Sequence, residues 1–244
     1  MQHINIQILC TRPLSPRLIA LAEENGINID IVPFIRTEPL ESKELSARIQ
    51  YLSSQSITAV FTSMNAAESV ISNLNGVKPL WRIYCLGNTT RKILVQYFGE
   101  ESIVAFAENA SALANTIVDT GTVCDAVFFC GDQRRDELPA ILGSRGVTLE
   151  EVIVYRTIAL TNTVNGQYQG ILFFSPSAVS AFFSSNKISA QTDLFAIGQT
   201  TAEEIKRFTN NTVVVADKAG KEELVNKTIA YYKSLKKESI AGRN

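Results

Sequence analysis

The sequence predicts an α/β protein made of two similar parallel-sheet domains of flavodoxin-like type, the second inserted into the first and joined to it by a two-stranded β-ladder. Two observations predict this class. Apolar, β-branched runs alternate with amphipathic runs along all 244 residues, and this alternation favours parallel sheets covered by helices on both faces. In addition, segments from the first part of the chain return later in the same order.

Strands are predicted at the short apolar runs, because that length and composition suit buried strands. In chain order they are Ile4–Cys10, Ile57–Phe61, Arg82–Leu86, Ser102–Phe106, Ala126–Cys130, Gly170–Phe174, Asp193–Ile197 and Thr212–Val215. Helices are predicted at the amphipathic runs between them. In chain order they are Ser15–Asn25, Ala66–Asn73, Thr89–Phe98, Ser111–Asp119, Glu137–Ser144, Ser177–Ser184, Thr200–Phe208 and Lys221–Leu235.

The repeat indicates a duplicated domain. The matched segments are 10–37 with 130–157, 61–65 with 173–177, and 87–90 with 198–201. Solenoid repeats are shorter and need at least three copies. The pattern therefore indicates duplication with insertion.

The order of the copies sets the predicted domain boundaries. The first domain comprises residues 1–33 and 158–244, and the inserted domain comprises residues 38–151. The chain then crosses between the domains twice, through residues 29–37 and 152–157. Both crossing segments are extended and apolar and end in Arg-Thr, so we expect them to pair as a ribbon hinge.

Composition and charge exclude several function classes. A formal net charge of −1 gives no basic field for nucleic acid or an anionic membrane, and no apolar run is long enough to cross a bilayer. The chain shows no signal-type segment, so we expect a cytoplasmic protein. We expect a monomer that acts on a small molecule, with no nucleic-acid or membrane partner.

The cysteine, histidine and glycine patterns narrow the chemistry further. The single histidine, His3, leaves no basis for a serine triad or a conventional zinc site. The four cysteines form no Cys-x-x-Cys pair, and we expect Cys10, Cys85 and Cys130 to be buried thiols. No glycine-rich phosphate loop occurs, which argues against the usual nucleotide-dependent enzymes.

Four strand-to-helix openings carry most of the candidate binding residues. At each opening, small polar residues stand at the carboxyl end of a predicted strand. They are Ser63 and Asn65; Asn88, Thr89 and Thr90; Ser175 and Ser177; and Gln199, Thr200 and Thr201. Each residue could be an ordinary helix cap. Because open α/β sheets bind ligands at the carboxyl ends of their strands, and helix N-termini attract anions, the four openings together indicate a site for several carboxylates or phosphates.

Three further residues are candidates by position. Arg12 and Arg134 follow strands in corresponding copies, where each could meet an acidic ligand or simply belong to a solvated helix start. Tyr155 lies in the second crossing segment, where its phenol could donate a proton to a leaving group or merely pack.

All of these candidates except Arg134 belong to seven short motifs that resemble the uroporphyrinogen-III synthase family of tetrapyrrole biosynthesis. The motifs span most of the chain: Cys10-Thr11-Arg12-Pro13; Phe61-Thr62-Ser63-Met64-Asn65-Ala66; Leu86-Gly87-Asn88-Thr89-Thr90; Phe129-Cys130-Gly131-Asp132; Val154-Tyr155-Arg156-Thr157; Phe173-Phe174-Ser175-Pro176-Ser177; and Ile197-Gly198-Gln199-Thr200-Thr201-Ala202. Their order, together with the interrupted duplication, makes the resemblance specific.

The resemblance implies two α/β domains and a cofactor-free reaction in the cleft between them. Hydroxymethylbilane, a linear tetrapyrrole whose pyrroles each carry an acetate and a propionate, would close to uroporphyrinogen III with loss of water and inversion of its terminal ring. Tyr155 would assist the departure of hydroxide. The residues that match family cleft positions would hold carboxylates: Ser63, Thr90, Ser175, Ser177, Thr200 and Thr201.

Two alternatives remain open on the sequence alone. A non-catalytic two-lobed binding or sensor protein could close on a small polyanion, although such proteins are normally exported and the chain shows no signal segment. A flavodoxin-like pair acting as a reductase or response regulator is disfavoured, because neither a clustered acidic phosphoacceptor site nor a glycine-rich cofactor loop occurs.

Overall fold

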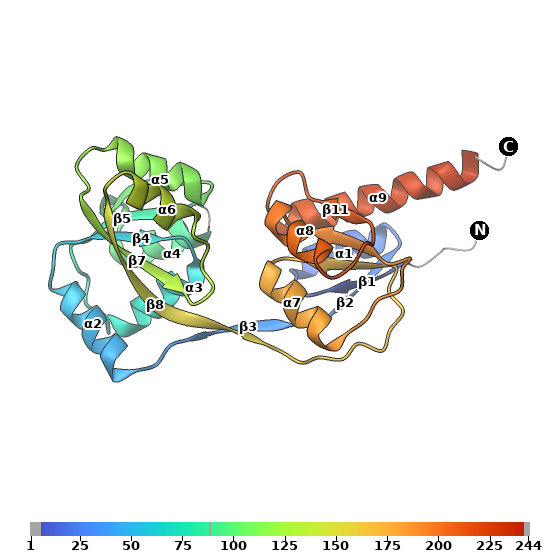
Figure 1. Ribbon diagram of the computed structural model, residues 1–244, viewed down its shortest axis with the longest axis horizontal. Helices are drawn as coiled ribbons and strands as arrows, with labels where there is room; N and C mark the ends of the chain where they lie inside the picture. Colours follow the sequence, from blue (N-terminus) through green and yellow to red (C-terminus); the bar gives the residue numbers. More distant parts are fainter. Residues whose placement is uncertain (1–5, 88, 242–244) are drawn as a thin grey trace. The chain divides into compact units, whose positions relative to one another are not determined.

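The computed structural model describes residues 6–87 and 89–241, with side chains described up to residue 235. It divides into two compact units: unit 1 comprises Met1–Arg36 and Ile158–Asn244, and unit 2 comprises Thr37–Thr157 (Figure 1). Each unit has a mostly parallel sheet with helices on both faces, so the predicted fold class is confirmed. None of the helices in the described part of the chain is long and apolar enough to cross a membrane.

The elements follow the predicted alternation. The strands are β1 (Ile6–Cys10), β2 (Ile27–Ile31), β3 (Ile35–Pro39), β4 (Thr58–Phe61), β5 (Arg82–Leu86), β6 (Ile103–Ala107), β7 (Asp125–Gly131), β8 (Thr148–Ala159), β9 (Gly170–Phe173), β10 (Asp193–Ala196) and β11 (Val213–Val215). The helices are α1 (Pro16–Glu24), α2 (Lys43–Ser53), α3 (Met64–Asn73), α4 (Thr89–Phe98), α5 (Ala110–Asp119), α6 (Glu137–Ser144), α7 (Pro176–Ser185), α8 (Gln199–Lys206) and α9 (Lys221–Ala241), with a 3-10 turn over Glu100–Ser102.

Unit 1 is built on a parallel sheet whose strand order, over the described residues, is β11-β10-β9-β1-β2. Successive residues of a strand face opposite sides of a sheet. In β1, Ile8 and Cys10 pack against α1 and α9, whereas Leu9 belongs to the core shared with α7 and α8. The sheet is therefore buried on both faces, as continuous apolar strands require.

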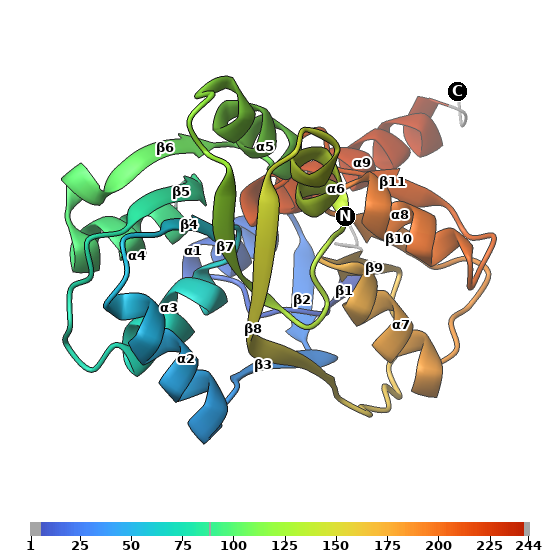
Figure 2. The ribbon, with the colours of Figure 1, turned by 60° about the vertical axis from the view of Figure 1, so that its left-hand side comes forward.

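Unit 2 repeats this plan with the order β3-β8-β7-β4-β5-β6 over its described residues (Figure 2). One face packs on α2, α3 and α4 around stacked aromatic rings, with Phe61 and Phe129 centroids 5.1 Å apart and Trp81 and Phe129 centroids 5.4 Å apart. The other face packs on α5 and α6 around Val60 and Phe128. The two cores give unit 2 its own apolar interior.

Residues 29–37, the first expected crossing segment, hold the end of β2 and the beginning of β3. β2 is an edge strand parallel to β1, and β3 pairs instead with β8. The break falls at Pro33, which has no N–H to donate to a ladder. Next to it, Phe34 turns inward against Phe182, with ring centroids 5.0 Å apart.

Residues 152–157, the second expected crossing segment, lie within one long strand, β8, which starts at Thr148 (Figure 2). Its first part runs parallel to β7, and it then pairs with β3. Leu40 donates its N–H to the Val154 carbonyl at 2.9 Å, and Leu160 donates to the Phe34 carbonyl at 2.8 Å. These two bonds describe an antiparallel ladder.

Helix α2 is an element that the sequence analysis did not name. Ser42 caps it by accepting a hydrogen bond from the Leu45 N–H at 3.0 Å, and its buried residues are Ile49 and Leu52.

The three cysteines predicted to be buried are buried, and Cys124 is exposed. Burial raises the pKa of Cys10, Cys85 and Cys130 from 9.0 to about 11 each. These thiols remain protonated at neutral pH and serve as small apolar packing groups.

Candidate active site

The strand-to-helix openings lie at the carboxyl edge of each sheet. In unit 1, β9 and β10 are adjacent and parallel, so the starts of α7 and α8 stand beside each other. In unit 2, β4 and β5 likewise place the starts of α3 and α4 side by side. Within each unit, the duplication therefore brings two helix N-termini together.

Two of the predicted binding residues are helix caps. The Ser63 hydroxyl oxygen accepts a hydrogen bond from the Asn65 N–H at 3.2 Å, and the Ser175 oxygen accepts one from the Ala178 N–H at 3.2 Å. Each accepting hydroxyl still carries a proton that it can donate. Capping and carboxylate binding are therefore compatible at these two positions.

The start of α8 is built differently. Its cap is Gly198, which has no side chain to accept from the first N–H groups of the helix. Gln199 and Thr200 are exposed. Thr201 is fully buried, and its hydroxyl has no hydrogen-bond partner among the described residues. A helix start with free N–H groups and an unsatisfied hydroxyl favours an anionic ligand.

The start of α4 is described only in part. Thr89 is exposed and Thr90 is buried. Asn88, which was predicted to bind the ligand, lies outside the described residues.

Tyr155 lies on β8, beside the carboxyl end of β7. It is the register partner of Gly131, after a shift in the pairing between Cys130 and Gly131. A Cβ placed on Gly131 would lie 2.4 Å from the Tyr155 ring, so the absence of a side chain there gives the phenol its place. The Tyr155 hydroxyl makes no hydrogen bond to any described residue, which leaves it available to a ligand.

Tyr155 and Asn65 line the same cavity in unit 2, of about 170 Å³. The structure thus brings together two of the predicted site residues. Other residues of the lining are Thr37, Glu38, Pro39, Glu68, Ser69 and Ser72. The sequence analysis missed Glu38 and Glu68, to which no motif pointed. The proximity of Glu38 to Tyr155 depends on the pairing of β3 with β8. That of Glu68 depends on the packing of α3 against β8, where Ser69 donates to the Val154 carbonyl at 2.6 Å.

The two candidate arginines have different surroundings. Arg134 forms ion pairs with Glu151 and Asp136, and the hydrogen bonds that it donates to these carboxylates, Glu151 first, raise its pKa further. Arg12 is exposed and has no ion pair within the described residues. Of the two, Arg12 is the one whose guanidinium remains open to an acidic ligand.

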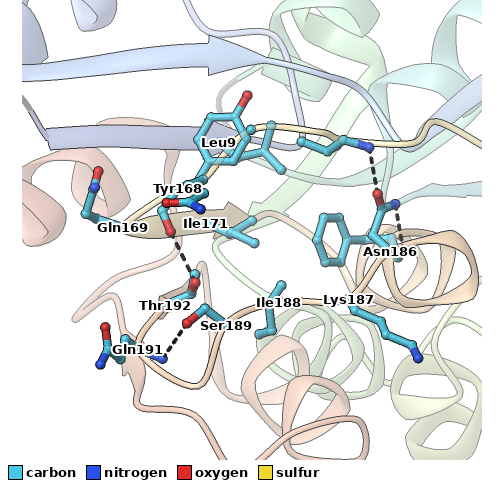
Figure 3. Close-up of a pocket in the computed structure, with 14 residues that line it drawn as sticks. Leu9, Tyr168, Gln169, Ile171, Asn186, Lys187, Ile188, Ser189, Gln191 and Thr192 are labelled. Atoms are coloured by element: carbon cyan, nitrogen blue, oxygen red, sulfur yellow. Dashed lines mark hydrogen bonds between the residues drawn. The ribbon is translucent and has the colours of Figure 1, made fainter.

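A second cavity, of about 400 Å³, lies in unit 1 at the opposite edge of the sheet (Figure 3). Gln169 and Thr192, in its lining, directly precede β9 and β10, which places it at the amino ends of the strands. Several of its polar groups already bond to the protein: Thr192 donates to the Tyr168 carbonyl at 3.1 Å, and Ser189 accepts from the Gln191 N–H at 3.2 Å. Of the predicted site residues that the structure describes, none lines this cavity.

Comparison with solved structures confirms the architecture. A uroporphyrinogen III synthase mutant from the extremely thermophilic bacterium Thermus thermophilus is similar with a TM-score of 0.67 and 15% identity, over 95% of this chain and 99% of that one. The uroporphyrinogen-III synthetase of Helicobacter pylori is similar with a TM-score of 0.62 and 16% identity, over 93% of this chain and 99% of that one. At such identities the similarity shows the fold.

The family model described as uroporphyrinogen-III synthase HemD matches residues 16–226, which is most of the chain and includes all four openings and Tyr155. It thereby supports catalysis over the alternative of a non-catalytic binding protein. The chain therefore belongs to the uroporphyrinogen-III synthase family, and its activity is that of a lyase of tetrapyrrole biosynthesis that cyclises hydroxymethylbilane to uroporphyrinogen III with loss of water.

Proposed function

We propose that the protein holds the carboxylates of hydroxymethylbilane at its strand-to-helix openings and that Tyr155 assists the loss of hydroxide. The start of α8 carries this proposal, because it combines a cap without a side chain and a buried hydroxyl that lacks a partner among the described residues. An acetate or propionate group would supply the missing acceptor.

The substrate is a flexible polyanion, while the protein has a net charge of −1. Recognition must therefore be local. The proposed ligands of the carboxylates are Ser63, Asn65, Asn88, Thr89, Thr90, Ser175, Ser177, Gln199, Thr200 and Thr201, together with Arg12. Hydroxyls and backbone N–H groups suit many carboxylates at once, because each is neutral and none requires burial of an unpaired charge.

The chemistry begins at the hydroxymethyl carbon. Tyr155 gives its proton to the hydroxyl group as the carbon–oxygen bond breaks, water leaves, and an electrophilic azafulvenium cation remains beside the Tyr155 phenolate. The substituted α-carbon of the terminal ring attacks this carbon and forms a spiro intermediate. Fragmentation and reclosure invert that ring, and the ring proton released at closure restores the Tyr155 phenol. Proton transfer of this kind contributes about a hundredfold to the rate.

We assign most of the rate enhancement to conformational restraint of the bound substrate. The uncatalysed chain also closes without inversion, so the enzyme must hold the terminal ring where only the substituted carbon can attack. Several fixed carboxylates would lower the entropy lost at that step and exclude the competing closure. We further propose that the protein acts as a cytoplasmic monomer and binds no nucleic acid.

The test is an isomer assay. The protein is incubated with freshly generated hydroxymethylbilane, the products are oxidised, and porphyrin isomers I and III are resolved. Isomer III should dominate, and formation of isomer I alone by folded protein would contradict the proposal. Tyr155→Phe should slow isomer III formation while the protein stays folded, and an unchanged rate would remove Tyr155 from the mechanism.

A further inference from the structure

The loop that follows β1 is fixed by three side chains. The Thr11 hydroxyl donates to the Leu172 carbonyl at 2.8 Å, the Cys10 thiol donates to the Arg12 carbonyl at 3.0 Å, and the Lys221 ammonium donates to the Pro13 carbonyl at 2.9 Å. Thr11 and Cys10 are buried. The backbone that carries Arg12 is therefore held in one position at the carboxyl end of β1.

Lys221 reaches this loop from a distant part of the sequence. It is the first residue of α9, and the following residues Leu224 and Val225 pack in the same core as Cys10 and Leu14. That packing sets the start of α9 against the end of β1. The free N–H groups of the first helical turn stand there as well.

The two cations at this point have no counter-ion among the residues that the structure describes, since neither Arg12 nor Lys221 forms an ion pair with any of them. The neighbouring Glu222 is engaged by Arg17 at 2.7 Å, and Asp217 is engaged by Lys227 at 2.9 Å. Partial burial lowers the pKa of Lys221, and the nearby Arg12 lowers it further. The positive charges of Arg12 and Lys221 repel each other, and an anion bound between them would relieve this repulsion.

We infer that Lys221 and Arg12 together bind one carboxylate of the tetrapyrrole at the carboxyl end of β1. This inference rests on the proposed function and adds to it a residue that no motif of the chain indicated. Lys221 uses one of its N–H groups on Pro13 and keeps two for the ligand. Because the Pro13 bond fixes the ammonium, little side-chain freedom is lost when the carboxylate binds.

The experiment compares Lys221→Gln with Lys218→Gln, a change at an exposed lysine of the same segment. Lys221→Gln should raise KM for hydroxymethylbilane about tenfold and change kcat little, as expected for a charge-assisted bond to a carboxylate. Lys218→Gln should leave both constants at the wild-type values. The Arg12→Gln Lys221→Gln double variant should raise KM by less than the product of the single effects, because the two residues share one ligand group.

Lys221→Arg tests the role of the charge, since arginine keeps the charge and can donate to the Pro13 carbonyl. It should restore KM to within a few-fold of wild type, and thermal unfolding of each variant shows whether the fold is intact. Equal KM values for Lys221→Gln and Lys218→Gln in folded, active protein would overturn the inference alone. A wild-type protein that yields only isomer I would overturn the proposed function, and the inference with it.

Discussion

Gly131 is the residue that leaves room for the Tyr155 ring. A Cβ at this position would lie 2.4 Å from the ring carbon that bears the hydroxyl and 2.8 Å from the hydroxyl oxygen. Gly131→Ala should displace the phenol, lower the free energy of unfolding by about 1–3 kcal/mol and slow isomer III formation. Urea denaturation and the isomer assay measure the two effects.

Gly143 provides the matched control. It lies in α6, and apart from the atoms of its own helix no described atom is within 4 Å of a Cβ placed there. Gly143→Ala should leave the rate unchanged and raise the free energy of unfolding by up to about 1 kcal/mol. Wild-type stability and rate in Gly131→Ala would show that the Tyr155 ring can shift without cost, and would contradict the role of Gly131 as the residue that provides space for this ring.

The thiols make stability depend on pH at the alkaline end. The pKa of Cys10, Cys85 and Cys130 is about 11 in the folded protein against 9.0 ordinarily, so the folded state favours the protonated form. Their contribution is complete below pH 9 and is lost as the pH rises from 9 to 11, by roughly 2 kcal/mol for each thiol. Denaturation at pH 8, 9.5 and 10.5 should show this decline.

Alkylation provides an independent check of the same burial. At pH 8 in the native protein, iodoacetamide should modify the exposed Cys124 and spare the other three thiols. Rapid modification of Cys10 in native protein would contradict its burial. Serine substitution of Cys124 should leave the pH dependence of stability in place.

At the scale of elements, a comparison of two helix caps separates substrate binding from helix stabilisation. Ser175 caps α7 at a proposed carboxylate site, and Ser42 caps α2 with the same type of bond. Ser175→Ala and Ser42→Ala should each cost about 1 kcal/mol of stability. Only Ser175→Ala should also raise KM, by about tenfold, because it alone removes a donor to the substrate. Equal KM values in the two variants would reduce Ser175 to an ordinary cap.

Elements with strong periodicity were predictable, and those set by tertiary pairing were not. Thr89–Phe98 and Glu137–Ser144 have the predicted bounds, because polar residues mark their starts and an apolar stripe runs through them. Helix α2 carries a cap and an apolar stripe of its own, so its signal was present but not used. The division of residues 29–37 between two strands falls at Pro33, a local signal that was present but not used. The packing of Phe34 against Phe182 beside this break is a contact that local sequence does not encode.

At the scale of the molecule, only part of the candidate site could be predicted from the sequence. The duplication alone predicts that the openings lie at strand ends, since the two copies repeat the same strand-to-helix transitions. The cavity that joins Tyr155 to Asn65 requires the register shift of β8 against β7. The approach of Lys221 to Pro13 requires α9 to pack beside β1. Both depend on contacts between residues far apart in the chain.

The insertion implies that unit 2 can fold without unit 1. Thr37–Thr157 is continuous and contains apolar cores on both faces of its sheet. Expressed alone, this segment should show a cooperative urea transition and a circular dichroism spectrum of mixed helix and strand.

Unit 1 is discontinuous, but the Leu160 N–H donates to the Phe34 carbonyl at 2.8 Å. A short Gly-Ser linker from Arg36 to Ile158 should therefore connect its two segments into one chain. Each unit alone should fail to form isomer III, because each holds only part of the proposed carboxylate sites. A structureless Thr37–Thr157 segment would show that the inserted unit depends on the rest of the chain.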